Sequence, residues 1–271
     1  MKNWLLPGIV IIMITFIGCH AATPNPTTTP EPTATPITED AKTIFEVWLA
    51  AAKGIESIQE DYNGTIVMVT KGASQSTTIT IEGQLHSKGN NSLEELEITV
   101  GTTKQRIRQY MSKDKVFVAT MVQGQWTTAK EVTPSIYFNA DEVQAEFESL
   151  YNKGALVPEA RVEPRLVSGE ECNELRLSAD LTKLSSKDRE FLLYSGGLSS
   201  VSDVGIYVDA ITSFAMRFCL LPNGMMLESE TTLELNPNAL PTDGIVSSHI
   251  VSTITHYEIN PVIPDSFFDL P

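Results

Sequence analysis

Histidine and cysteine are the side chains best suited to catalysis or metal binding, and this sequence of 271 residues holds 4 histidines and 3 cysteines. His249 and His256 share a predicted strand but differ in parity, which places them on opposite faces and argues against a metal pair. The sequence also lacks HExxH, GxSxG, a P-loop and a dinucleotide-binding glycine pattern. We therefore expect no enzyme, no metal site and no cofactor.

Cys19 follows an apolar stretch that is typical of a secretory signal. Lys2 precedes apolar residues 4–17, a run of about 14 residues, where roughly 20 are needed to span a bilayer. Phe16-Ile17-Gly18-Cys19 resembles the lipobox of exported lipoproteins, in which the cysteine sulfur is lipidated, although Phe16 stands where leucine is usual. We predict a signal peptide over residues 1–18 and a lipid anchor at Cys19. The alternative is an uncleaved N-terminal anchor, and both interpretations place the rest of the chain at the extracytoplasmic face of the cell membrane.

The segment after the anchor has the composition of a tether. Proline and threonine dominate residues 19–38, which favours an extended chain of polyproline II character. We expect one folded domain over residues 39–271. The formal net charge of -15 disfavours nucleic acid as a partner and assigns membrane attachment to the anchor rather than to a basic surface.

Two cysteines remain in the predicted domain. In an oxidising compartment, Cys172 and Cys219 could form a disulfide. The alternative is two separate buried thiols, because free cysteine packs as a small hydrophobe. The distance between the two Cα atoms decides between them.

Two short motifs could accept N-linked glycans. They are Asn63-Gly64-Thr65 and Asn90-Asn91-Ser92, so the candidate positions are Asn63, Asn90 and Asn91. The second motif lies in a predicted turn and is the better candidate.

Three segments show helical spacing. Residues 40–58 carry an apolar stripe that includes Phe45 and Trp48, and Val143 and Phe147 belong to a second stripe that should end near Gly154. Residues 185–194 form a short third helix.

The rest of the domain shows the period of two that is typical of strands. Strands are predicted at 64–70, 79–85, 96–100, 105–111, 115–122, 125–130, 160–167, 171–178, 204–221, 225–235 and 245–259. An antiparallel sheet of about 10–11 strands should curve strongly. The fold class is therefore α+β, an unclosed β-barrel whose concave face is covered by α-helices.

Several motifs, taken in order, resemble a known superfamily. Gly54-Ile55-Glu56-Ser57-Ile58 leads into Tyr62-Asn63-Gly64-Thr65, Gly124-Gln125-Trp126 turns into a strand, and Leu220-Leu221-Pro222-Asn223-Gly224 forms a hairpin before the closing segment 260–271. The domain resembles the LolA-type periplasmic lipoprotein carriers, the lipid-carrying lipoproteins of mycobacteria and the N-terminal domain of the envelope-stress sensor RseB. The resemblance implies an apolar cavity for acyl chains between the sheet and its helices.

Large apolar side chains on the predicted inner surfaces are the candidate ligand contacts. By parity and helical spacing they are Phe45, Trp48, Ile79, Ile81, Ile98, Met111, Phe117, Met121 and Phe147. Ordinary core packing is the alternative for any one of them.

The leading hypothesis is a membrane-anchored lipoprotein that binds a lipid or another apolar ligand for carriage or retention. The alternative is an envelope sensor or scaffold that binds another protein through the same fold.

Overall fold

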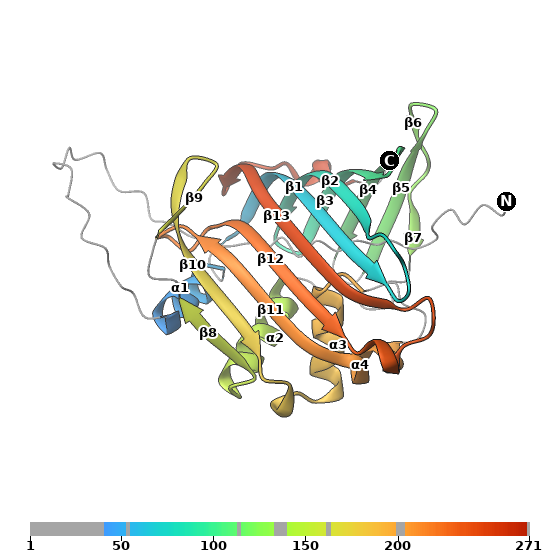
Figure 1. The fold of residues 1–271 in the computed structure, drawn as a ribbon. Coiled ribbons are helices and arrows are strands. Elements are labelled where there is room, and N and C mark those ends of the chain that lie inside the picture. The colour runs from blue at the N-terminus through green and yellow to red at the C-terminus, as the bar shows by residue number, and fades with distance from the viewer. Residues whose placement is uncertain are drawn as a thin grey trace.

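The structure, a computed structural model, describes residues 41–52, 55–112, 115–132, 140–160, 164–198 and 204–269. The predicted signal peptide (1–18), the anchor Cys19 and the tether (19–38) lie outside the described residues. Within the described ranges, one antiparallel sheet dominates (Figure 1). Its strands are β1 (Ser57–Thr70), β2 (Thr77–Lys88), β3 (Asn91–Val100), β4 (Thr103–Ser112), β5 (Lys115–Val122), β6 (Gln125–Trp126), β7 (Lys130–Val132), β8 (Leu156–Ala160), β9 (Arg165–Val167), β10 (Glu170–Ala179), β11 (Ile211–Leu220), β12 (Met226–Leu235) and β13 (Ile245–Ile259).

The strand order is β6-β5-β4-β3-β2-β1-β13-β12-β11-β10-β8, with β7 beside β5 and β9 beside β10. The two ends of this order do not pair, so the barrel is unclosed and the predicted α+β class is confirmed. The sheet has 13 strands in the described residues rather than 10–11, because β6, β7 and β9 are strands of two or three residues that composition cannot resolve.

Four helices lie against one part of the sheet. They are α1 (Ala41–Ala52), α2 (Ala140–Asn152), α3 (Ser186–Ser195) and α4 (Val204–Ala210), with short 3₁₀ turns η1 (Leu181–Lys183), η2 (Pro237–Ala239) and η3 (Asp265–Phe268). A capping box between Ser185 and Asp188 starts α3, and Gly154, at φ +67°, follows the end of α2. Among the described helices, none is long and apolar enough to cross a membrane.

Two predicted element boundaries are wrong because long-range pairing overrides local spacing. The spacing predicts a first helix that reaches residue 58, yet Ser57 and Ile58 already pair with β2, and Ile58 also pairs with Ile259. The side chain of Asn260 accepts hydrogen bonds from the backbone N–H groups of Glu56 (3.1 Å) and Ser57 (3.3 Å), which fixes the start of β1. The strand expected over 160–167 is replaced by β8, which ends at Ala160, and β9.

The strand expected to start at Val204 begins with a helix instead. Val204–Ala210 forms α4, and β11 starts only at Ile211. The Tyr207 hydroxyl accepts a hydrogen bond from the backbone N–H of Ile245, and the carbonyl of Ala210 accepts one from Asn236 (2.7 Å). These contacts to distant residues hold a β-branched segment in a helix.

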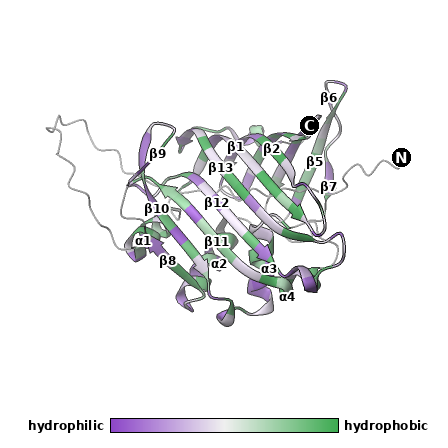
Figure 2. Ribbon diagram, in the orientation of Figure 1, coloured by the Kyte–Doolittle hydropathy of each residue, from purple (hydrophilic) through white to green (hydrophobic). Residues whose placement is uncertain are grey.

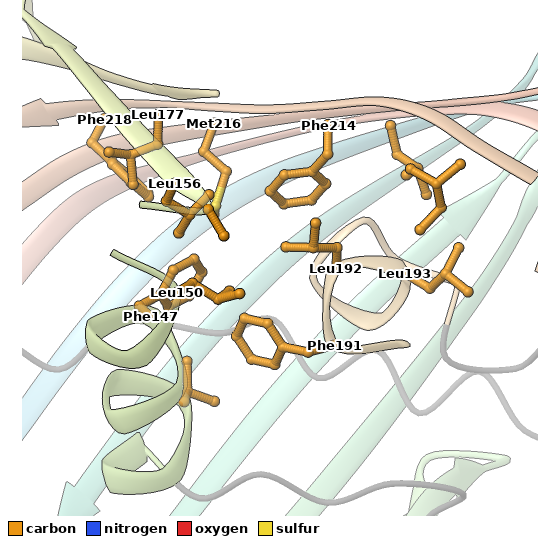
Figure 3. Packing of buried hydrophobic residues seen from close by; sticks show 14 of the residues in the cluster. Phe147, Leu150, Leu156, Leu177, Phe191, Leu192, Leu193, Phe214, Met216 and Phe218 are labelled. Atoms are coloured by element: carbon orange, nitrogen blue, oxygen red, sulfur yellow. The ribbon is translucent and has the colours of Figure 1, made fainter. Parts of the chain in front are cut away.

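The main core lies between the helices and β10–β12. Figure 3 shows Phe147 and Leu150 of α2 and Phe191 of α3 pointing at Phe214 and Phe218 of β11. The ring of Trp48 from α1 stacks on Phe218, with centroids 5.2 Å apart. We call the sheet face that meets the helices the inner face.

Cys172 and Cys219 form a disulfide between β10 and β11, with Cα atoms 5.4 Å apart. Both residues are buried, and they pack with Val167 and Leu227 in a small cluster away from the main core. The bridge joins the two parts of the chain that flank α3 and α4.

A bulge in β13 overturns the parity argument about the histidines. Tyr62 pairs with Ile254 while the preceding residue, Asp61, pairs with His256, so Thr255 is an extra residue. The extra residue reverses the parity, and His256 therefore lies on the same sheet face as His249. In the described part of the chain, no group of three or more His, Cys, Asp or Glu residues could hold a metal ion.

Candidate functional site

The inner face of β1–β3 and β13 carries a second apolar cluster, separate from the main core. Its buried members are Tyr62, Ile66, Ile79, Ile81, Leu85, Leu96, Ile98 and Ile254, and we call it the strand cluster. All of these residues come from strands. The buried apolar helix residues of the described chain pack in the main core instead. Met68 contacts both clusters and marks the boundary between them. Apolar and polar residues alternate along these strands (Figure 2).

A row of polar side chains crosses the inner face beside the strand cluster. The register pairs Glu60 with Leu85, Leu85 with Glu94, and Glu94 with Gln109, so four neighbouring strands contribute one residue each. Strands lie about 4.8 Å apart, which separates the Cβ atoms of Glu60 and Glu94 by about 10 Å. Glu60 is 0% exposed and Glu94 and Gln109 are each 2% exposed. Residues 94–97 include three glutamates, a composition typical of a solvated strand face, yet Glu94 is buried.

Tyr62 connects this row to the strand cluster. Its hydroxyl donates a short hydrogen bond to Oε1 of Glu94, and its ring lies over Gly83, where a Cβ atom would overlap it. Glycine is therefore required at position 83 for Tyr62 to lie flat on the sheet and reach across to β3.

Three other polar atoms of the row have no hydrogen-bond partner among the described residues. Neither carboxyl oxygen of Glu60 has a hydrogen-bond partner among the described residues, and the same holds for Nε2 of Gln109. Buried polar groups in proteins are nearly always hydrogen-bonded, and each exception calls for an explanation.

Burial in this apolar setting shifts the protonation of both carboxyls. Desolvation, with a smaller effect from the charge of Glu94, raises the pKa of Glu60 from 4.5 to about 8. Desolvation also raises the pKa of Glu94 to about 7, although its hydrogen bond from Tyr62 opposes the shift. Burial and the adjacent Glu94 raise the pKa of Tyr62 well above its usual value. At neutral pH the row therefore holds protons that exposed glutamates would have lost.

Three of the predicted ligand contacts belong to the strand cluster. Ile79, Ile81 and Ile98 lie side by side on β2 and β3, and Met111 on β4 lies on the same face, half-buried. Their assignment as ligand contacts stays a prediction.

The other predicted contacts lie elsewhere. Phe45, Trp48 and Phe147 are fully buried in the main core, where their rings pack on one another and on β11. The register places Phe117 and Met121 on the outer face, because Phe117 pairs with Tyr110 and Met121 with Trp126. The nine residues thus do not form one wall. Sequence reasoning also missed Glu60, because a polar residue is expected on the exposed face of a strand. The signal that could have identified it is its even spacing with Tyr62 and Ile66 on β1, which places all three on one face.

The outer face of β1–β4 holds a shallow polar depression of about 380 Å³. Asp61, Glu82, Glu95, Glu97 and Arg106 are among its lining residues. Two of its carboxylates have cationic partners: Glu95 binds Arg108 at 2.6 Å and Glu97 accepts a hydrogen bond from Lys104. The depression is a solvated, internally paired surface.

The candidate glycosylation positions differ in accessibility. Asn63 is exposed beside the polar depression, and Asn90 is exposed in the turn between β2 and β3. Asn91 is half-buried, and its side-chain oxygen accepts a hydrogen bond from Ser112 (2.8 Å). Their modification stays a prediction.

Comparisons with known proteins give a family match to part of the chain and distant structural neighbours. The model for a family of unknown function, DUF6612, matches residues 40–153. No curated protein matches.

Three solved structures with similarity to this chain are distant from it in sequence. A chain in the Pseudomonas aeruginosa MucA/MucB complex is 11% identical, with a TM-score of 0.36 over 86% of this chain and 62% of that chain. A putative outer membrane lipoprotein-sorting protein domain from Vibrio parahaemolyticus is 7% identical, with a TM-score of 0.30 over 85% and 97% of the two chains. A DUF1329 family protein from Desulfovibrio piger is 8% identical, with a TM-score of 0.30 over 86% and 98%. Function must therefore be argued from the site itself.

Proposed function

We propose that this chain is a membrane-anchored extracytoplasmic lipoprotein that holds a lipid or acylated molecule against the strand cluster, without covalent chemistry. The observation that carries the proposal is the separation of the two clusters. Among the described residues, the helices pack on β10–β12, while the cluster on the apolar inner face of β1–β3 contains only strand residues. A half-barrel cannot fill its concave face with side chains from its own strands. An apolar ligand that packs against this face would complete that packing.

The energetics suit an acyl chain. Each methylene group moved from water onto an apolar surface contributes about 0.8 kcal/mol to the free energy of binding. Transfer of a ten-carbon chain is therefore favourable enough for stable binding. Branched side chains such as Ile79, Ile81 and Ile98 give a smooth wall that discriminates little between acyl chains. Retention of a class of lipids is thus a better description than recognition of one lipid.

The predicted anchor defines where such a protein would act. A chain fixed to the bilayer at Cys19 receives or stores a ligand beside the membrane and does not shuttle across the compartment. Replacing the sulfur in Cys19→Ser should release the protein from the membrane fraction. Unchanged membrane retention would contradict the lipid anchor while leaving the ligand site untouched.

A pair of adjacent substitutions tests the ligand site. Ile98→Trp places a large ring on the strand cluster, whereas Thr99→Trp places the same ring on the outer face. We expect the full-length chain to bind a fluorescent fatty acid with a saturable rise in emission, Ile98→Trp to reduce this binding, and Thr99→Trp to leave it unchanged. Equal binding by both variants, or none by the wild type, would contradict the proposal.

A second candidate, a sensor or scaffold that binds another envelope protein, is favoured by one feature. Leu166 on β9 is 71% exposed and Val157 on the edge strand β8 is 43% exposed, which leaves apolar surface at a sheet edge. A photo-crosslinking residue at position 166, compared with one at exposed position 80, tests it. Specific cross-links at 166 alone, in a chain that binds no fatty acid, would favour this function over lipid retention.

A further inference from the structure

The buried carboxyls of Glu60 and Glu94 differ from the other fully buried glutamate of the sheet. Glu174 is 0% exposed and has three arginines within reach: Arg176 at 3.0 Å, Arg217 at 3.7 Å and Arg165 at 3.9 Å. The negative charge of Glu174 is thus offset by neighbouring cationic side chains. Glu60 is equally buried and has no ion-pair or hydrogen-bond partner among the described residues.

Such an arrangement is costly for the empty protein. A buried carboxyl without a partner loses the hydrogen bonds that it made to water, which costs about 1–3 kcal/mol or more. Leucine at position 60 would avoid this cost within the same strand. A ligand group that donates hydrogen bonds to Glu60 would recover that cost at the moment of binding.

We propose that the Glu60–Glu94 row is the head-group end of the ligand site and that it selects an amphiphile with an ammonium head. This inference rests on the proposed function, since the acyl chain would lie on the strand cluster. The geometry supports it because the row adjoins Leu85 and Tyr62, two members of the cluster, on the same sheet face. An ammonium group offers three donors and one positive charge, which matches the two unpartnered carboxyl oxygens of Glu60 and the neighbouring carboxyl of Glu94. The unpaired Nε2 of Gln109 could donate to an oxygen only in a ligand that carries one beside the ammonium group.

The protonation of the row makes binding depend on pH. The groups that face Glu60 are Tyr62 on its own strand, Leu85 on β2, Glu94 on β3, Gln109 on β4 and the cross-strand neighbour Tyr257 on β13. None of these is a cation, and burial holds a proton on Glu60 in the empty site at neutral pH. An ammonium head favours the carboxylate form, so its binding must release a proton. Affinity should therefore rise between pH 6 and pH 8, by up to about tenfold per pH unit.

Three probes with the same chain separate the head group from the acyl chain. Dodecylamine, dodecanol and dodecanoate are titrated calorimetrically into the full-length chain carrying Cys19→Ser, in two buffers of different ionisation enthalpy to count protons. We expect the amine to bind about tenfold or more tightly than the alcohol, with proton release, and the acid to bind most weakly.

Glu60→Gln is the decisive variant and Glu82→Gln is its control. Both replace one carboxyl group by an amide, but Glu82 is exposed on the outer face of the neighbouring strand. Glu60→Gln should abolish the preference for the amine and the proton release, and Glu82→Gln should keep both. Equal binding of amine and alcohol by the wild type, or an amine preference that persists in Glu60→Gln, overturns the ammonium assignment. If none of the three probes binds, the proposed lipid site itself fails.

Discussion

The stability of the folded chain should fall as pH rises through neutrality, because of Glu60. Its pKa is about 8 in the folded chain and near 4.5 when exposed, so the folded state holds a proton that the unfolded state has lost over this range. Stability decreases with pH wherever the folded state binds more protons. The contribution of Glu60 is thus fully present below pH 4.5 and is lost by pH 8.

The magnitude follows from the shift. One carboxyl with a raised pKa changes the free energy of unfolding by about 1.4 kcal/mol per pH unit between its two pKa values. Between pH 5 and pH 8, Glu60 should cost roughly 4 kcal/mol of stability, and Glu94, raised to about 7, adds to this over its narrower window. Glu60→Gln removes the titrating group, so this variant should match the wild type near pH 5 and exceed it by several kcal/mol at pH 8.

Urea unfolding at pH 5, 6, 7 and 8, with the disulfide kept oxidised, measures this difference through the fluorescence of the buried Trp48. Glu82→Gln serves as the control and should follow the wild type at every pH. A wild-type unfolding free energy that stays constant from pH 5 to pH 8 would refute the reasoning. A Glu60→Gln variant that kept the wild-type dependence on pH would refute it equally.

Two further perturbations probe the framework of the site. Gly83→Ala should destabilise the chain by about 1–3 kcal/mol, because the added methyl group overlaps the Tyr62 ring, and adding Tyr62→Leu should recover part of the loss in the same unfolding assay. Cys172→Ser should lower the free energy of unfolding by about 2–4 kcal/mol, since the bridge closes a loop with a sequence separation of 47. An unchanged midpoint in Gly83→Ala, or in Cys172→Ser under non-reducing conditions, would contradict these roles for the glycine and the bridge.

Much of the sheet can be predicted from sequence because its turns are local. Gly72, Gly89 and Gly124 each adopt a positive φ at a predicted strand boundary, a conformation that glycine adopts without strain. The third helix is predictable because Ser185 and Asp188 form its cap within one turn. Signals of this kind depend on residues a few positions apart.

Sequence-based predictions fail where distant residues decide the structure. Val204–Ala210 has strand-forming composition, yet contacts from Ile245 and Asn236 hold it as a helix. The parity of His256 changes because of a bulge at Thr255 that no local pattern predicts. The inward position of Glu60 is hidden for a related reason: its pairing opposite Leu85 of β2, a residue distant in the sequence, places it on the inner face.

The pairing of β1 with β13 places the first and last strands of the described domain at the centre of the sheet. Ile58 lies opposite Ile259, so the contact that joins the two halves is among the most distant in sequence. Contacts of such long range form late and slowly, because the intervening chain must first be ordered. A chain emerging from the ribosome lacks one of the two central strands of this sheet until β13 has been synthesised. Topology therefore delays completion of the sheet until β1 and β13 can pair.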